Sequence, residues 1–306
     1  MKEINRRLFL KKSTACAIIG TIFNGFIIKN SNAMYKTLQS TEFKGNLKKG
    51  LYYGMLPKSL GIEEKFKVAK KVGFEGIEVP TIENPDMVEE MKQVAKISGI
   101  KIHSIMNSLH WKYPFSSDDP SVIKKGMEGM ETSLRNAKEF GADSVLLVPA
   151  VVDVKTSYKD AYTRSQKYIK ELLPLAKELN VIIAIENVWN KFLLSPLEFL
   201  RYIEEFDNPY LKAYFDVGNI VLYGIPQDWI RTLGKQIVKI HIKGFNEKTR
   251  EFVNLGEGTI DWLEVRRALS DIGYNGYITA ELRGGDENYL LNVSGTMDKI
   301  IAGEKI

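Results

Sequence analysis

Four successive apolar segments in the C-terminal half of the chain each carry a side chain that can bind a metal ion. These side chains are Glu186, Asp216, His241 and Glu281. A carboxylate at the tip of an apolar segment has lost much of its water, so it needs a charged partner, a raised pKa or a cation. Around one divalent cation, three carboxylates and a neutral imidazole balance to a net charge of about −1. Oxygen-rich ligation with a single nitrogen suits Mn²⁺, Mg²⁺, Co²⁺ or Zn²⁺.

Each of these residues also has a purely structural interpretation. A glutamate such as Glu186 at the end of a strand is commonly a salt-bridge partner, and His241 could simply cap a loop. Ordinary surface charge rarely places Glu, Asp, His and Glu in this order, one on each of four successive segments. The pattern therefore predicts one metal site that uses all four residues.

These segments belong to a regular alternation of short apolar runs and longer stretches with helical periodicity. Eight runs rich in β-branched and aromatic residues predict strands. They span residues 50–56, 74–80, 100–107, 142–150, 181–188, 211–219, 237–244 and 277–283. Several of the helical stretches between them end in a glycine, where a left-handed cap is expected. These glycines are Gly73, Gly99, Gly141 and Gly273.

The arrangement predicts an α/β fold of one domain, a (β/α)8 TIM barrel at residues 50–306 after an N-terminal linker at 34–49. A Gly-aromatic-x-Gly phrase recurs at 73–76 and 273–276, which indicates a repeated βα unit. Pro174 predicts a kink or a break in its helix. A doubly wound open sheet is the alternative, but it would need a Gly-rich phosphate turn after the first strand. In a barrel, the four metal-binding side chains would share one rim.

Residues 1–33 have the features of an export signal. Arg6 and Arg7 precede a short apolar centre, and the segment ends in Ser31-Asn32-Ala33. The apolar part is too short to span a bilayer, and the paired arginines resemble the twin-arginine signal, which exports folded proteins. We expect a periplasmic or otherwise exported protein, cleaved after Ala33. A disordered basic tail and a retained membrane tether are the alternatives.

The charge and the cysteine content argue against several partners and cofactors. The first 33 residues hold six of the 43 Lys and Arg and one of the 38 Asp and Glu, which leaves 37 of each in the remainder. A neutral body argues against nucleic acid as a partner and against membrane binding beyond the signal. The only cysteine, Cys16, lies in the signal, so the mature chain would have no disulfide and no cysteine-ligated metal.

The segments "IAIENVW", "YFDVGN", "KIHIKGF" with "NLGEGTIDW", and "YITAEL" resemble the sugar phosphate isomerase/epimerase family of xylose isomerase-like TIM barrels. The resemblance covers nearly the whole mature chain. It implies that the four residues hold one divalent metal, and that Glu186 and Glu281 face each other across the substrate as an acid/base pair. This chain has Asn219 where several epimerases of the family carry a histidine, and it has Gly244 where the family often has an aspartate. These departures concern which sugar is bound.

The predicted activity is a divalent-metal-dependent sugar isomerase or epimerase that abstracts a proton next to a carbonyl. A cation polarises the carbonyl and makes that proton removable. Inversion at the same carbon is epimerisation, return of the proton to the neighbouring carbon is isomerisation, and expulsion of a β leaving group would make the enzyme a lyase on a 3-keto-glycoside. All three outcomes use Glu186 and Glu281, so the sequence leaves the choice open.

Two other classes of protein are alternatives to this activity. A non-catalytic exported sugar-binding protein would keep the metal, although binding alone does not need both glutamates. An abasic-site endonuclease type of barrel binds three zinc ions and needs many histidines, whereas this chain has three. Asn219 and the neutral charge argue against it further.

Other residues near the rim are weaker candidates for substrate binding. They are Glu78, His103, Trp111, Trp189, Asn219 and Lys243. Glu78 and His103 could bind hydroxyls or be structural, and the two tryptophans offer flat faces to a sugar, although packing is the commoner role. Lys243 follows His241 by two residues, so it should share that side of the strand and could meet a hydroxyl or a carboxylate. His110 is expected to be a loop residue without a special role.

Export bears on the substrate and the partners. Phosphorylated sugars are cytoplasmic metabolites, so the predicted substrate is a free sugar, a keto-sugar or an oxidised glycoside. A sugar oxidoreductase that makes 3-keto-sugars would be a fitting partner in the same pathway. The family resemblance also allows a homo-oligomer, either a dimer or a tetramer.

Overall fold

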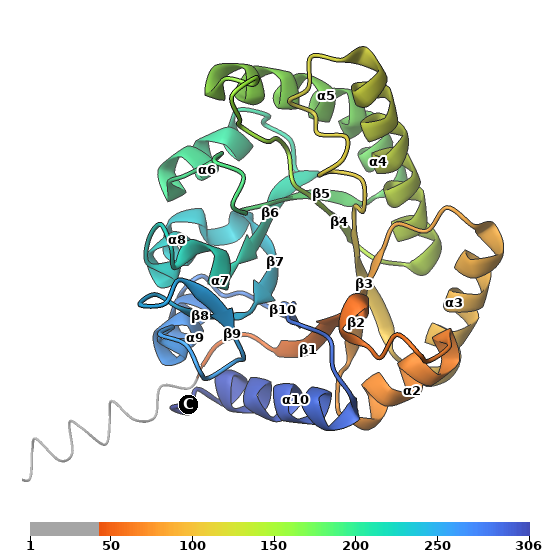
Figure 1. Cartoon of the computed structure of the whole chain (residues 1–306), viewed down its shortest axis with the longest axis vertical. Coiled ribbons are helices and arrows are strands. Elements are labelled where there is room, and N and C mark those ends of the chain that lie inside the picture. The colour runs from red at the N-terminus through yellow and green to blue at the C-terminus, as the bar shows by residue number, and fades with distance from the viewer. Residues whose placement is uncertain (1–42) are drawn as a thin grey trace, which may run out of the picture. The chain divides into compact units, whose positions relative to one another are not determined.

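The computed structural model describes residues 43–306, so the predicted signal at 1–33 and most of the predicted linker lie outside the described residues. Eight parallel strands close into a barrel in the order β1-β10-β7-β6-β5-β4-β3-β2 (Figure 1). Their bounds are Leu47–Tyr52 (β1), Gly76–Pro80 (β2), Lys101–Met106 (β3), Ser144–Leu147 (β4), Ile182–Glu186 (β5), Leu211–Asp216 (β6), Ile237–Ile242 (β7) and Gly276–Ala280 (β10). The predicted (β/α)8 class is therefore confirmed.

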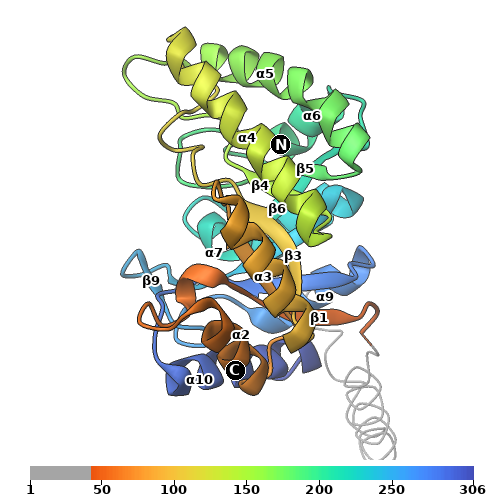
Figure 2. The same ribbon diagram turned by 90° about the vertical axis from the view of Figure 1, so that its right-hand side faces the viewer.

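Helices surround the ring of strands, as the two views in Figures 1 and 2 show. The longer helices are Ile62–Lys71 (α2), Pro85–Ser98 (α3), Pro120–Phe140 (α4), Tyr158–Leu179 (α5), Pro196–Glu204 (α6), Pro226–Leu233 (α8), Trp262–Asp271 (α9) and Glu287–Ala302 (α10). Short turns of helix are Tyr53–Met55 (η2), Val217–Ile220 (α7) and Gly234–Gln236 (η3). The main core lies between the strands and the helices, where residues such as Leu51, Phe66 and Phe199 are fully buried.

The helix ends agree with the expected caps. Gly73, Gly99, Gly141 and Gly273 all have positive φ, from 66° to 92°, a region in which a side chain would be strained. The first strand begins at Leu47, three residues before the predicted run and inside the predicted linker.

Pro174 does not break its helix, because α5 runs without interruption from Tyr158 to Leu179. Pro174 lies on the exposed side of α5. Solvent can therefore satisfy the carbonyl group of the preceding turn that proline leaves without a donor. The prediction of a break was wrong for this reason.

A short antiparallel hairpin, which the sequence pattern did not predict, follows β7. It consists of β8 (Gly244–Asn246) and β9 (Glu251–Val253), paired Gly244 to Val253. A Cβ atom on Gly244 would lie 2.2 Å from the carbonyl oxygen of Asn254, so glycine is needed for the close approach of the two segments. The hairpin follows β7, the strand that carries His241, and forms part of the loop at its C-terminal end.

Within residues 43–306, no helix combines the length and the apolar character that a membrane crossing requires.

Candidate metal centre and active site

The structure brings the four predicted metal-binding residues together at the C-terminal ends of their strands. Glu186 ends β5, Asp216 ends β6, His241 lies near the end of β7, and Glu281 directly follows β10. One ligand atom from each of the four lies within 4.8 Å of the other three. The strand register explains the convergence, since His241 on β7 pairs with Asp216 on β6 and with Thr279 on β10.

One nitrogen of His241 faces the carboxylates. Its Nδ1 atom lies 3.0 Å from Glu186 Oε1, 3.6 Å from Glu281 Oε2 and 4.0 Å from Asp216 Oδ2. Its Nε2 atom points the other way and lies 2.9 Å from Glu78 Oε1. The imidazole therefore offers Nδ1 to the cluster, while Nε2 is held by a separate carboxylate.

The donor set fits a divalent cation. Asp216 Oδ1 accepts a hydrogen bond from the Asn219 backbone N–H at 2.7 Å, and its buried Oδ2 lies 3.0 Å from the Lys243 ammonium group. Three carboxylates and an imidazole nitrogen this close together are costly without further positive charge, which a divalent cation would supply. Glu186, Asp216, His241 and Glu281 would hold the metal, three through oxygen and one through nitrogen.

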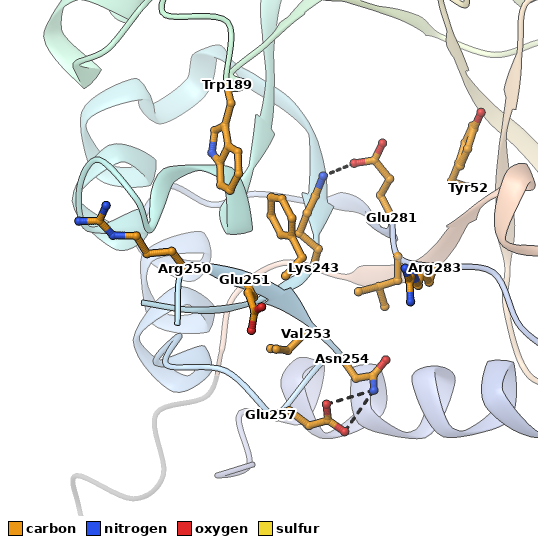
Figure 3. A pocket seen from close by; sticks show the side chains of 12 residues that line it. Tyr52, Trp189, Lys243, Arg250, Glu251, Val253, Asn254, Glu257, Glu281 and Arg283 are labelled. Carbon is orange, nitrogen blue, oxygen red and sulfur yellow. Dashed lines mark hydrogen bonds and ion pairs between the residues drawn. The ribbon is translucent and has the colours of Figure 1, made fainter. Parts of the chain in front are cut away.

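Lys243 lies beside this cluster, on the same side of the chain as His241. Its ammonium group contacts Glu281 Oε2 (Figure 3). The same group lies 3.0 Å from Asp216 Oδ2. Burial acts to lower the pKa of Lys243, but the carboxylates of Asp216 and Glu281 raise it above its ordinary value overall. Lys243 therefore stays charged at the edge of the cluster, where it lines the adjoining cavity.

The two candidate catalytic glutamates have different electrostatic surroundings. Burial raises the pKa of Glu186 to about 7, and repulsion from Glu281 adds to this effect. Burial also acts to raise the pKa of Glu281, but the Lys243 ammonium and His241 lower it below its ordinary value overall. Two carboxyl groups with pKa values pushed apart are typical of an acid/base pair.

Metal binding is expected to weaken as pH falls through 7. Below its pKa of about 7, the Glu186 carboxyl carries a proton that a metal ion must displace, so each pH unit lowers the affinity by about tenfold for this group. Calorimetric titration with Mn²⁺ in buffers of different ionisation enthalpy would count the protons released. A metal affinity that is constant from about pH 5.5 to pH 7.5 would contradict this prediction.

Glu78 contacts the His241 nitrogen that faces away from the other carboxylates and does not line the cavity, which corrects the prediction of a substrate-binding residue. Its side chain has no exposed surface, and its two oxygens meet His241 Nε2 at 2.9 Å and the Tyr214 hydroxyl at 2.7 Å. A carboxylate behind a metal-binding histidine fixes the tautomer and the orientation of the ring. Glu78 is therefore a positioning residue for His241.

We expect Glu78→Gln to weaken metal affinity by about 10-fold to 100-fold, the effect typical of an outer-shell carboxylate. The glutamine can offer an N–H group to Nε2, and the proton then moves to Nδ1, where it blocks the metal. Competitive titration of Mn²⁺ against a fluorescent chelator would measure the change in the dissociation constant. Tyr214→Phe is the matched variant, since it removes one hydrogen bond to Glu78 but keeps its charge, and it should have a smaller effect.

His103 is buried and does not line the cavity, which does not fit its predicted role in substrate binding. Its ring stacks on Tyr277 with the centroids 4.1 Å apart. Burial holds the pKa of His103 well below its usual range, so the ring is neutral. The pairing of β2 with β3 jumps from Ile102 to Ser104, which leaves His103 as an extra residue in a bulge. It packs inside the barrel.

The other candidates divide between the cavity wall and its supports. Trp189 lines the cavity beside the cluster, whereas Trp111 is half-exposed, contacts His110 edge-on and is not among the lining residues. The side-chain amide of Asn219 donates to the carbonyl of Asn187 at 3.0 Å, so Asn219 braces two rim loops. Neither Trp111 nor Asn219 lines this cavity, and their binding of substrate stays a prediction.

His110 lies in a loop, as predicted, but it is buried. Its Nδ1 accepts a hydrogen bond from the Val148 backbone N–H, so it ties the loops after β3 and β4 together. Burial lowers the pKa of His110 to about 4, and the ring is therefore uncharged at neutral pH.

A cavity of about 890 Å³ opens beside Glu281 and Lys243, and most of its wall was not predicted from the sequence (Figure 3). The unpredicted residues come from the end of β1, the β8–β9 hairpin and the segments that follow the hairpin and β10. They are Tyr52, Arg250, Glu251, Phe252, Val253, Asn254, Glu257, Leu282 and Arg283. The aromatic and charged residues of "REFVNLGE" after the His241 strand were the available signal.

The structure is a barrel that carries, at its rim, a cluster of carboxylates and a histidine able to hold a metal ion. Residues 66–297 match the family described as "Xylose isomerase-like TIM barrel", and the chain belongs to this family. The match agrees with the resemblance seen in the sequence motifs.

The names of several similar proteins describe sugar epimerases. L-ribulose-5-phosphate 3-epimerase UlaE of Escherichia coli strain K12 is 24% identical over 245 residues, which cover 76% of this chain and 86% of the relative. Among solved structures, a D-tagatose 3-epimerase-like protein aligns with a TM-score of 0.73 at 18% identity, covering 83% of this chain and 97% of its own. The 3-keto-D-glucoside 4-epimerase YcjR from E. coli aligns with a TM-score of 0.72 at 17% identity, covering 84% of this chain and 100% of its own. The structural matches support the fold.

Proposed function

We propose that the protein is a divalent-metal-dependent sugar epimerase that acts by removing a proton next to a carbonyl group. The observation that carries the proposal is the convergence of Glu186 and Glu281 on the same atom, His241 Nδ1, at 3.0 Å and 3.6 Å. These carboxylates come from strands on either side of the β6–β7 pair. The relatives named as sugar epimerases support the same chemistry.

The residues divide the work of such a reaction. A bound divalent cation would polarise the substrate carbonyl and balance the negative charge that develops on its oxygen. One of the two glutamates removes the proton from one face of the carbon, and the other returns a proton to the opposite face, which inverts the centre. Lys243, charged and 3.0 Å from Asp216, is placed to donate a hydrogen bond to a substrate oxygen.

We further propose that the substrate is an unphosphorylated sugar, a keto-sugar or an oxidised glycoside. The cavity wall holds equal numbers of basic and acidic side chains, namely Lys243, Arg250 and Arg283 against Glu251, Glu257 and Glu281. A phosphate group would favour a net positive site. The basic and apolar features of residues 1–33 support export, and an exported enzyme would encounter few phosphate esters.

The function is tested by incubating the Mn²⁺-loaded protein with candidate sugars in D₂O and following the products by NMR. D-tagatose, L-ribulose and methyl 3-keto-glucoside are compared with L-ribulose 5-phosphate. We expect deuterium at an α-carbon, together with the epimer, for at least one unphosphorylated sugar. Activity on the phosphate ester alone would overturn the substrate proposal. Elimination products would identify a lyase, and binding without exchange would identify a sugar-binding protein.

Export and the partners have their own tests. Fractionation of cells that carry the natural chain, with mass spectrometry of its N-terminus, should give a periplasmic protein that begins after Ala33. The double substitution Arg6→Lys and Arg7→Lys should abolish export.

A sugar oxidoreductase is the proposed pathway partner, because a 3-keto-sugar that it supplies would carry the activated α-proton. Light scattering of the purified protein would decide whether it forms the expected dimer or tetramer.

A further inference from the structure

The cavity beside the metal cluster extends well beyond the reacting groups. Its volume of about 890 Å³ is near the upper end of the roughly 300–1,000 Å³ typical of sites that enclose drug-sized ligands. Glu281, Lys243 and Tyr52 form one part of its wall, and Arg250, Glu251 and Glu257 lie toward the opposite end (Figure 3). The space therefore accommodates a ligand longer than the ring that would react at the glutamates.

Three aromatic residues, Trp189, Phe245 and Phe252, form an aromatic platform at this cavity. The rings of Trp189 and Phe252 stack at 4.7 Å, and both meet the buried Phe245 edge-on, at 5.7 Å and 5.3 Å. The Trp189 indole N–H donates to the carbonyl of Asn219 at 2.9 Å, which fixes its orientation. Trp189 and Phe252 are nevertheless 39% and 45% exposed. A rigid pair of large, exposed aromatic rings that lines a cavity is typical of a binding surface.

The aromatic platform is directly connected to the candidate catalytic groups. Trp189 follows Glu186 by three residues, and the hairpin that carries Phe252 follows Lys243. The Lys243 ammonium lies 5.4 Å from the centroid of the Phe252 ring and also contacts Glu281. A sugar ring that reacts at Glu281 would thus leave the platform free for a neighbouring unit of the same molecule.

The polar groups around the platform favour an uncharged neighbour. The basic and acidic side chains of the cavity balance, and Asn254 donates to both oxygens of Glu257 at 3.1 Å and 3.2 Å. Such mixed donors and acceptors suit the hydroxyl groups of a sugar, while the apolar C–H face of the ring can lie on an aromatic face.

We propose that the β8–β9 hairpin and Trp189 form a subsite for the second, non-reacting sugar unit of an oxidised disaccharide. This unit stacks on the aromatic platform, and the oxidised ring lies between Glu186 and Glu281. The identity of the reacting ring rests on the proposed epimerase function, whereas the presence of the subsite does not.

A kinetic test uses two substitutions at Phe252 and two substrates in D₂O. Phe252→Leu keeps an apolar side chain in the hairpin but loses the flat ring, and Phe252→Tyr keeps the ring. We expect Phe252→Leu to raise KM for 3-keto-cellobiose by about tenfold, several times more than it raises KM for methyl 3-keto-glucoside. Phe252→Tyr should raise KM for 3-keto-cellobiose less than Phe252→Leu does, and Ile97→Leu, at an exposed position on α3, is the control that should behave as the unaltered protein. An equal effect on both substrates, or no effect on either, would overturn the subsite.

A binding test separates failure of the subsite from failure of the proposed function. Calorimetry of the Mn²⁺-loaded protein with unoxidised cellobiose and with glucose requires no turnover. We expect cellobiose to bind at least about tenfold more tightly than glucose, and Phe252→Leu to remove this preference. Preference for cellobiose without any exchange activity would keep the subsite and reject the epimerase. Exchange activity without a preference for cellobiose would reject the subsite and keep the epimerase.

Discussion

Replacing either Glu186 or Glu281 with glutamine is expected to lower the rate of epimerisation by about 10³-fold, within the range typical of a general acid or base. Glutamine keeps the size of the side chain and one oxygen that can bind a metal, but it cannot accept the substrate proton. The measurement is the conversion of one epimer into the other, followed by NMR at saturating Mn²⁺, with the metal content of each variant determined by elemental analysis.

The two variants should also differ from each other in solvent exchange. If each glutamate serves one face of the substrate carbon, each variant retains deuterium uptake into one epimer only and loses the inversion. Glu131→Gln, an exposed position on α4, is the control and should retain full activity. Full epimerisation in either active-site variant would show that one carboxylate suffices and would reject the paired mechanism.

Removal of divalent metal ions is the second change with a large expected effect. Chelation should reduce the rate by more than about 10³-fold, because polarisation of the carbonyl contributes several kcal/mol. Addition of Mn²⁺, Co²⁺, Mg²⁺ or Zn²⁺ should restore activity to different extents. The same ions should stabilise the fold, by about 2.7 kcal/mol at a concentration 100 times Kd. Calorimetric melting with and without each ion measures this effect.

Asp216→Asn provides the matched variant for the metal prediction. It keeps the acceptor oxygen that the Asn219 N–H contacts, but removes the negative charge of Oδ2, the oxygen that lies among the other candidate metal ligands. We expect the asparagine variant to melt at the same temperature with or without Mn²⁺ at concentrations that stabilise the natural protein. Full activity of a protein shown by elemental analysis to be depleted of metal would contradict a metal-dependent mechanism.

The barrel class and the metal cluster could be predicted from local sequence patterns. A strand shows its period of two in a few residues, and a glycine such as Gly99 marks the end of a helix because of its φ. Glu186 and Asp216 end their strands, and parallel strands in a barrel bring such ends to one rim. The position of each of these residues could therefore be inferred from its own segment.

The roles of Glu78 and His103 could not be inferred in this way. A strand pattern indicates which face a residue lies on, but its depth in the barrel depends on the stagger between tilted neighbouring strands. Glu78 meets Tyr214 and His241, which lie 136 and 163 residues away, and the bulge at His103 appears only in the pairing of β2 with β3. These are contacts between segments that are distant in the sequence.

The sequence by itself thus determined the barrel, its strand ends and the four donors of the proposed metal centre. Only the tertiary structure decided that Glu78 supports His241, that Lys243 contacts Glu281, and that a hairpin adds Phe252 to the cavity wall. The physical reason is that strand and helix signals are local. The depth of a side chain inside the barrel and the packing of a three-residue strand are set by partners that no single segment contains.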